Sequence, residues 1–176
     1  MMDPAPIDLA QLANDRAEIA DTLYRYAFGL DHGDADSLAS AFTADAILDF
    51  TPAAAKLGIK FPVMTGRDVI VQTLIPLIGP LDTSHTASNL QIEVNGDSAT
   101  LHAYVMSQHY MPGEGSRQGS DHTLFMNRYD ADLVRDGQTW RFQHVSIDTA
   151  WAEGDPAIIN ALATLRAKRA KAKPGG

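Results

Sequence analysis

An aspartate and a histidine far apart in the sequence are the residues best suited to chemistry. Asp31 ends a largely apolar helical stretch (YRYAFGLDHGD, 24–34), and His85 lies in TSHTASN (83–89). A buried carboxylate is costly unless it is paired. A neutral imidazole, with a reference pKa of about 6.5, accepts a proton near neutrality, and a carboxylate on its other nitrogen stabilises the imidazolium. We predict that the two form an acid–base pair; helix capping by Asp31 and strand packing of His85 are the structural alternative.

The composition narrows the chemistry further. The 176 residues include no cysteine, which excludes disulfides, thiolate zinc sites and cysteine nucleophiles. Ser84, Ser88 and Ser107 lack the setting of a nucleophile elbow, so serine hydrolysis is not expected. Acid–base groups remain the leading candidates.

Six histidines leave a metal site to be considered. His109 shares a strand face with Leu101 and should point inward, and His122 on the next strand could lie opposite it. These two histidines and Asp31 could in principle hold a metal. No H-x-H or H-E-x-x-H motif supports such a site. We expect a polar pocket wall instead, with no metal and no cofactor.

The charge distribution argues against a nucleic-acid partner. The net charge is −8, but the chain before its basic tail (166–173) carries nine basic and 22 acidic residues, a net charge of −13. Such a body repels phosphate backbones. The sequence shows no signal peptide and no apolar run long enough to span a membrane, so we expect a cytoplasmic protein without a membrane partner.

The first half of the chain is typically helical. Residues 1–13 are expected to form an arm, and the spacing of Asp15 and Glu18 predicts a capping box that begins a helix ending near Gly33. Asp34 should cap a short second helix. The elements expected next are a strand (45–50), an irregular loop that covers a pocket (51–66) and a third helix (67–77).

The second half alternates as strands do. Asn95-Gly96 and Asp136-Gly137 are hairpin signals, because these residues tolerate positive φ. They predict two hairpins, and Asp155-Pro156 predicts a basic C-terminal helix and tail (155–176). The strands expected are 83–94, 99–111, 118–134 and 139–151.

These elements predict a single domain (1–176) of the α+β class. Because the strands are long, the antiparallel sheet should curve around the N-terminal helices and form a conical α+β barrel. One difficulty is parity: Leu90 and Ile92 alternate on one face of their strand, and His85 falls on the other. His85 can face the cavity only if a bulge intervenes between 85 and 90.

The motifs of the chain resemble those of a known family. The early Tyr24-Arg25-Tyr26 and Leu30-Asp31, the H-T-A-S-N segment at 85–89 and the late W-R-F at 140–142 resemble the SnoaL-like branch of the NTF2-like superfamily over residues 12–151. The superfamily includes dehydratases, dehydrochlorinases, isomerases, polyketide cyclases and non-catalytic members, so the fold alone does not decide the function.

The resemblance implies roles for particular residues. It identifies Asp31 and His85 as the pair used by several lyases of the group, with Tyr26 assisting in some. Some of these lyases place an arginine just after the W-x-F motif, where this chain has Gln143 and His144. Either His144 replaces that cation, an arginine from elsewhere (Arg128 or Arg141) reaches in, or the substrate needs none.

These observations predict a cofactor-independent lyase acting on an apolar, aromatic or cyclic small molecule. Dehydration is the leading reaction, with retro-aldol deformylation of lignin-type diarylpropanes as a related form. An isomerase or polyketide cyclase is one alternative, and a non-catalytic ligand-binding or subunit-assembly protein is another. His109 is expected to polarise a substrate oxygen together with Tyr26. The expected substrate-binding residues are Tyr24, Phe50, Met64, Tyr104, His122, Asn127, His144 and Trp151.

The outward face of the sheet predicts self-association. His102, Tyr104 and Met106 should point away from the cavity, and an open face bearing them exposes apolar area. We therefore expect a homodimer or homotrimer.

Overall fold

The first helix of the computed structural model, which describes residues 8–161, is longer than expected. Helix α1 (Leu9–His32) begins at Asp8, whose carboxylate accepts hydrogen bonds from the backbone N–H groups of Ala10 and Gln11. Residues 9–13 are therefore helical rather than an arm. The helix ends at Gly33, as predicted, where φ is +64°.

Asp15 lies inside α1 and is not its N-cap. Its side chain is almost fully buried and forms a bidentate ion pair with Arg135, with N–O distances of 2.6 and 2.8 Å. The indole N–H of Trp140 also donates to it, at 3.2 Å. The carboxylate that resembled a capping residue therefore ties α1 to the last two strands.

The segment after α1 is more regular than expected. Asp34 caps α2 (Ala35–Ser40), as predicted, and strand β1 (Phe42–Asp49) follows. Helix α3 (Thr51–Leu57) and strand β2 (Met64–Thr65) occupy much of the stretch expected to be an irregular loop, and Pro52 and three alanines explain the helix, since proline suits the first turn and alanine favours helix. Helix α4 (Arg67–Ile78) has Pro76 in its last turn.

The two predicted hairpins are confirmed. Strands β3 (Asp82–Asn95) and β4 (Ser98–Tyr110) form the first, and β5 (His122–Asp136) and β6 (Thr139–Gly154) form the second. The turn glycines, Gly96 and Gly137, have φ values of +63° and +66°.

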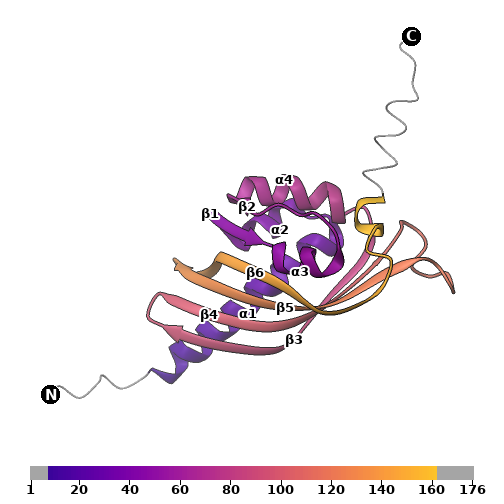
Figure 1. Ribbon diagram of the computed structural model, residues 1–176. Helices are drawn as coiled ribbons and strands as arrows, with labels where there is room; N and C mark the ends of the chain where they lie inside the picture. The colour runs from indigo at the N-terminus through magenta and orange to yellow at the C-terminus, as the bar shows by residue number, and fades with distance from the viewer. Residues whose placement is uncertain (1–7, 162–176) are drawn as a thin grey trace, which may run out of the picture.

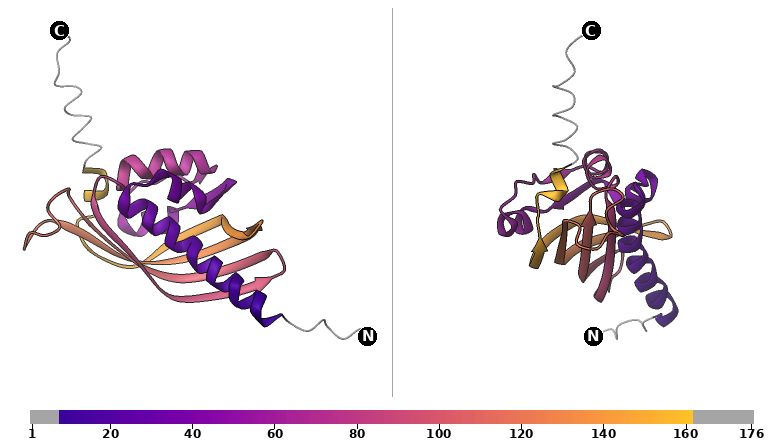
Figure 2. Two further views of the ribbon diagram at one scale, coloured as in Figure 1. Left: turned by 180° about the vertical axis from the view of Figure 1, so that it is seen from behind. Right: turned by 90° about the vertical axis from the view of Figure 1, so that its right-hand side faces the viewer.

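The sheet is curved but open. Its order is β2-β1-β6-β5-β4-β3, with β1 and β6 parallel and the other neighbours antiparallel (Figure 1). The α+β class and the curved sheet are confirmed. The sheet does not close on itself within the described residues, and β2 and β3 are its two edges. Helix α1 crosses one face of the sheet diagonally (Figure 2). Helix α4 lies near the C-terminal end of α1.

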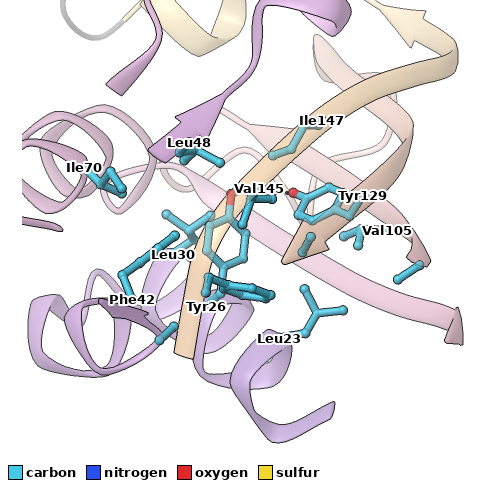
Figure 3. Close-up of a cluster of buried hydrophobic side chains, with 14 of the residues drawn as sticks. Leu23, Tyr26, Leu30, Phe42, Leu48, Ile70, Val105, Tyr129, Val145 and Ile147 are labelled. Carbon is cyan, nitrogen blue, oxygen red and sulfur yellow. Dashed lines mark hydrogen bonds between the residues drawn. The ribbon is translucent and has the colours of Figure 1, made fainter. Parts of the chain in front are cut away.

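The inward side chains of the sheet form the core against α1. Along β4 and β5 every second residue is buried, which places Leu101, Val105, Tyr129 and Leu133 on the inner face. The helix contributes its apolar stripe. Figure 3 shows part of this cluster, including Leu23, Tyr26 and Leu30 of α1 around Phe42 and Val145.

The predicted bulge in β3 is present. The β3–β4 register runs without interruption from Asp82 to Ser88, then shifts before Gln91, and Asn89 adopts a φ of +54°. The shift changes the parity of the strand. His85 and Ile92 can therefore both face inward, which resolves the difficulty posed by the sequence.

The C-terminal prediction is only partly visible. Asp155 accepts a hydrogen bond from the backbone N–H of Ala157, at 2.9 Å, and residues 158–161 are helical. The rest of the predicted basic helix lies outside the described residues. Within residues 8–161, no helix has the length and apolar character needed to cross a membrane.

Candidate active site

The end of α1 is held close to its neighbours by glycines. A Cβ atom on Gly29 would lie 2.6 Å from the backbone nitrogen of Leu38 in α2, and one on Gly79 would lie 2.8 Å from the Cα of Gly33. Only glycine permits such close approaches. They fix the position of the last turn of α1, which carries Asp31.

Asp31 is bound by three donors from β3. The hydroxyl of Thr83 donates to Oδ1 at 2.8 Å, the backbone N–H of His85 donates to Oδ2 at 2.9 Å, and Nδ1 of His85 lies 2.6 Å from Oδ1. The His85 side chain is 5 % exposed. With Nδ1 directed at the carboxylate, the other ring nitrogen, Nε2, is left for a ligand.

The carboxyl of Asp31 remains ionised in this setting. Burial acts to raise its pKa, but the hydrogen bonds and charge of His85, together with the hydroxyl of Thr83, outweigh burial and hold the pKa below its ordinary value of 3.8. A carboxylate is therefore present to orient His85 and to stabilise its protonated form.

A mostly apolar cavity of about 550 Å³, counting its open mouth, adjoins His85. The segment 50–64 contributes to its wall, as predicted for a pocket cover, although part of that segment is helical. The apolar lining residues are Leu30, Leu48, Phe50, Ile59, Phe61, Met64, Leu74, Ile78, Phe125, Ile147 and Ile159.

Six residues place polar groups on this apolar wall. They are Tyr26, His85, Ser107, His109, Asn127 and Tyr129. Ser107 Oγ and His109 Nδ1 are buried and have no hydrogen-bond partner among the described residues. Buried polar atoms usually have partners. A ligand oxygen or nitrogen in the cavity could supply the missing contacts.

His109 packs edge to face against His85, with ring centroids 5.3 Å apart and an interplanar angle of 89°. Burial, reinforced by His85, lowers the pKa of His109 to about 3. The ring is therefore neutral near pH 7 and can donate one N–H without carrying charge.

Asn127 and Tyr26 are also held in defined positions. The hydroxyl of Thr149 donates to the side-chain oxygen of Asn127 at 2.8 Å, which leaves the amide NH₂ of Asn127 as its free donor. Burial raises the pKa of Tyr26 to about 12, so its phenol remains protonated.

The structure brings together only part of the predicted site. Asp31 and His85 are paired, and the cavity is lined by Tyr26, Phe50, Met64, His109 and Asn127. Of the other expected substrate-binding residues, none lines this cavity. Those residues are Tyr24, Tyr104, His122, His144 and Trp151.

Strand parity and helix geometry explain these corrections. Tyr104 and His122 alternate with buried neighbours and point outward, and Tyr24 lies on the exposed side of α1, 51 % exposed. His144 would follow Phe142 inward, but the β5–β6 register shifts between Asp132 and Leu133, so His144 is turned outward. Trp151 would follow Thr149 inward, but the β5–β6 register shifts between these positions, so Trp151 is turned outward and is 48 % exposed.

The three cations considered in place of that arginine, Arg128, Arg141 and His144, do not line the described cavity. Arg128 lies over the Tyr104 ring on the outer face, Arg141 donates to Asp136 and to the backbone oxygen of Ser40, and His144 lies 3.7 Å from Asp132. The described cavity lining contains no lysine or arginine. The first two possibilities raised by the sequence, His144 or an arginine that reaches in, therefore receive no support from the described residues.

A metal site receives no support from side-chain placement. Among residues 8–161, no three His, Cys, Asp or Glu side chains are grouped so that they could hold an ion. His122 lies against Tyr110, outside the cavity, so the triad of His109, His122 and Asp31 considered from the sequence does not assemble.

Two polar lining residues were missed by the sequence-based site. Neither Ser107 nor Tyr129 was among the expected catalytic or substrate-binding residues. Ser107 has the same parity as His109, and Tyr129 the same parity as Asn127. Strict alternation from the two predicted cavity residues would have found both.

The chain is similar in sequence to several known proteins. Residues 11–146 match the SnoaL-like domain family. The terrestric acid biosynthesis cluster protein E of Penicillium crustosum is 34 % identical over 163 residues, which cover 90 % of this chain and 99 % of that protein. An uncharacterized protein of Mycobacterium tuberculosis is 29 % identical over 143 residues, covering 80 % and 88 % of the two chains.

Solved structures share the fold. A protein from Kribbella flavida superposes with a TM-score of 0.69 at 28 % identity, covering 81 % of this chain and 95 % of the other. A hexachlorocyclohexane dehydrochlorinase from Novosphingobium barchaimii gives a TM-score of 0.66 at 20 % identity, with coverages of 86 % and 97 %. At 20 % identity the second likeness concerns the fold alone.

Proposed function

Since this chain belongs to the SnoaL-like family, as its motifs suggested, we propose that it is a cofactor-independent lyase that acts on an apolar aromatic or cyclic small molecule. The observation that carries the proposal is the 2.6 Å contact between Asp31 and His85 beside an apolar cavity. The relative named for a biosynthesis cluster supports a small-molecule substrate.

His85 is the proposed base. Its Nε2 removes a proton from a carbon next to a carbonyl or phenol, the electron pair forms a new double bond, and a hydroxyl leaves. The imidazolium, stabilised by Asp31, returns the proton to the leaving oxygen, so that water is released. This elimination requires no oxidant or reductant, and a positioned base of this kind typically contributes about 10² to 10⁴ in rate.

Tyr26 and His109 are proposed to assist by donating hydrogen bonds. Tyr26 is a protonated phenol in the wall, and His109 is a neutral ring with a free nitrogen. Both suit a substrate oxygen that gains negative charge during proton removal. Asn127 is a further donor on the same wall.

The test begins with a screen of phenolic and polyketide-like hydroxyketones for loss of water, followed by mass spectrometry. With a turned-over compound, H85A and D31N should each lower kcat/KM by about 10² or more while melting temperature and ligand binding are retained. H102A is the matched control, since it removes a histidine that pairs with Asp130 outside the cavity, and it should change kcat/KM less than about twofold.

Two results would contradict the proposal. Unchanged turnover in H85A would remove the pair from the mechanism. Saturable ligand binding with no turnover of any compound in the screen would favour the non-catalytic alternative.

A further inference from the structure

Two tyrosine hydroxyls meet inside the cavity from different elements. Tyr26 comes from α1 and Tyr129 from β5, their rings pack edge to face with centroids 5.9 Å apart, and the hydroxyl oxygens are 3.5 Å apart. Both side chains are almost fully buried and line the cavity. Figure 3 shows both hydroxyl oxygens, in red, directed toward the same space.

The two hydroxyls do not satisfy one another. Hydroxyl hydrogen bonds are usually about 2.7 to 2.8 Å long, so a contact of 3.5 Å is weak. If Tyr129 donates to Tyr26, the proton of Tyr26 has no acceptor among the described residues, since the contact with Tyr129 is the one hydrogen bond of that hydroxyl within residues 8–161. One acceptor oxygen on the cavity side of the pair, forming a triangle with the two hydroxyl oxygens, would lie within hydrogen-bond distance of both.

The charges around the pair favour a neutral acceptor. Burial and the negative charge of Asp31 raise the pKa of Tyr26 to about 12, and burial, followed by the neighbouring Tyr26 and Asp31, raises that of Tyr129 well above its ordinary value. Both phenols therefore remain donors. Because the described lining holds no lysine or arginine, an anionic ligand would be buried there without either cation to offset the loss of its hydration.

We propose that Tyr26 and Tyr129 together bind one carbonyl oxygen of the substrate, and that the substrate is therefore a neutral ketone or enone rather than a carboxylate. Tyr129 becomes a further substrate-contacting residue. The role in turnover rests on the function proposed above: as His85 takes the proton, the electron pair of the C–H bond moves toward the carbonyl oxygen, and two O–H donors stabilise the charge that develops there.

The experiment measures binding without requiring turnover. The probes are 2-acetylnaphthalene, labelled with ¹³C at its carbonyl, and two relatives of the same ring size, 2-naphthoate and naphthalene. Affinity is measured by fluorescence titration, and hydrogen bonding by the shift of the carbonyl stretching band. The variants are Y26F, Y129F and the double variant, with Y104F on the outer face as the matched control.

The expected result is a ketone that binds at least about tenfold more tightly than the carboxylate. Y26F and Y129F should each weaken ketone binding by about three- to tenfold and reduce the band shift, while naphthalene binding changes less than about twofold. Y104F should leave all three affinities and the band unchanged. Melting curves confirm that each variant is folded.

Other outcomes overturn the inference. Tighter binding of the carboxylate, absence of saturable ketone binding, or an unchanged carbonyl band in folded Y129F would each exclude a shared carbonyl site. H85A separates this inference from the lyase proposal, because it should abolish turnover and still show the full band shift. If the wild type shows no carbonyl band shift but its turnover still depends on His85, the tyrosine site is refuted and the lyase proposal is not.

Discussion

Of the histidine–aspartate pairs within residues 8–161, two have nearly the same geometry but opposite surroundings. Nδ1 of His85 lies 2.6 Å from Asp31, and Nδ1 of His102 lies 2.5 Å from Asp130. The His85 side chain is 5 % exposed beside the cavity, whereas that of His102 is 57 % exposed on the outer face. A short contact alone therefore does not distinguish the two pairs; burial, additional donors and an adjoining cavity make the His85 pair the candidate for function.

The two pairs should differ most in the stability that is lost when the carboxylate of each pair, Asp31 or Asp130, is removed. D31A leaves the Thr83 hydroxyl and two donors of His85 without their acceptor, which should lower the free energy of unfolding by about 2 to 4 kcal/mol. D130A removes an exposed partner and should cost about 0.5 kcal/mol or less. Urea denaturation measures both, and equal losses would contradict the contrast.

The buried ring of His109 should make the stability of the protein depend on pH, unlike an exposed histidine. Its folded pKa of about 3 lies below the unfolded value of about 6.5, so below pH 6.5 the unfolded state binds a proton that the folded state does not. As the pH falls below 6.5, His109 should therefore lower the free energy of unfolding by up to about 1.4 kcal/mol per pH unit, or about 2 kcal/mol between pH 6.5 and 5. H109F should remove that slope relative to the wild type, with pH 8 as the common reference; identical slopes would show that the ring is not held neutral.

Asp15 is buried and, like Asp31, paired, but neither Asp15 nor its partner Arg135 lines the cavity. Its hydrogen bond to Arg135 lowers its pKa from 3.8 to about 2, despite burial. The resulting stability, about 2 kcal/mol, is fully present above pH 3.8 and is lost as pH falls through 3.8 toward 2. D15N should lower stability at pH 7 by about that amount, narrow the difference from wild type at pH 2, and leave kcat/KM within about twofold. A large fall in kcat/KM in folded D15N would contradict a purely structural role.

Substitutions on the outer face of the sheet should affect kcat/KM least. Met106, Met126 and Trp151 stand in register across β4, β5 and β6, and the first and last are 39 % and 48 % exposed. Such an apolar row supports the predicted homodimer or homotrimer. Sedimentation velocity at micromolar concentration should detect it, and M106K should shift it toward monomer while changing kcat/KM less than about twofold. A monomeric wild type would refute the association.

The sequence predicted the site best where periodicity and local chemistry agreed. The helix end, both hairpins and the inward direction of His109 followed from such patterns. The need for a bulge in β3 was also predicted, because His85 and Ile92 differ in parity, and Asn89 is the residue whose backbone provides it. Asp31 and His85 were found because a carboxylate on a core helix needs a partner.

Other features depend on contacts that one sequence does not display. Asp15 has the spacing of a capping residue, yet its ion pair with Arg135, 120 positions away, decides its role. Trp151 was predicted to face the cavity, but a register shift next to Asn127 turns it outward. The sequence pattern of β6 gives no sign of that shift. The open sheet edge likewise depends on how far the strands curve, which strand length alone does not determine.

The way α1 holds β3 also bears on how the protein avoids aggregation. Strand β3 is a free edge, and such edges offer unpaired backbone groups to other chains. Asp31 binds the backbone N–H of His85, and Arg16 donates to the backbone oxygen of Ile92, at 2.6 Å. The helix thus occupies one donor and one acceptor where a foreign strand would otherwise add. We therefore expect the carboxylate that contacts His85 also to disfavour the addition of a foreign strand at this edge.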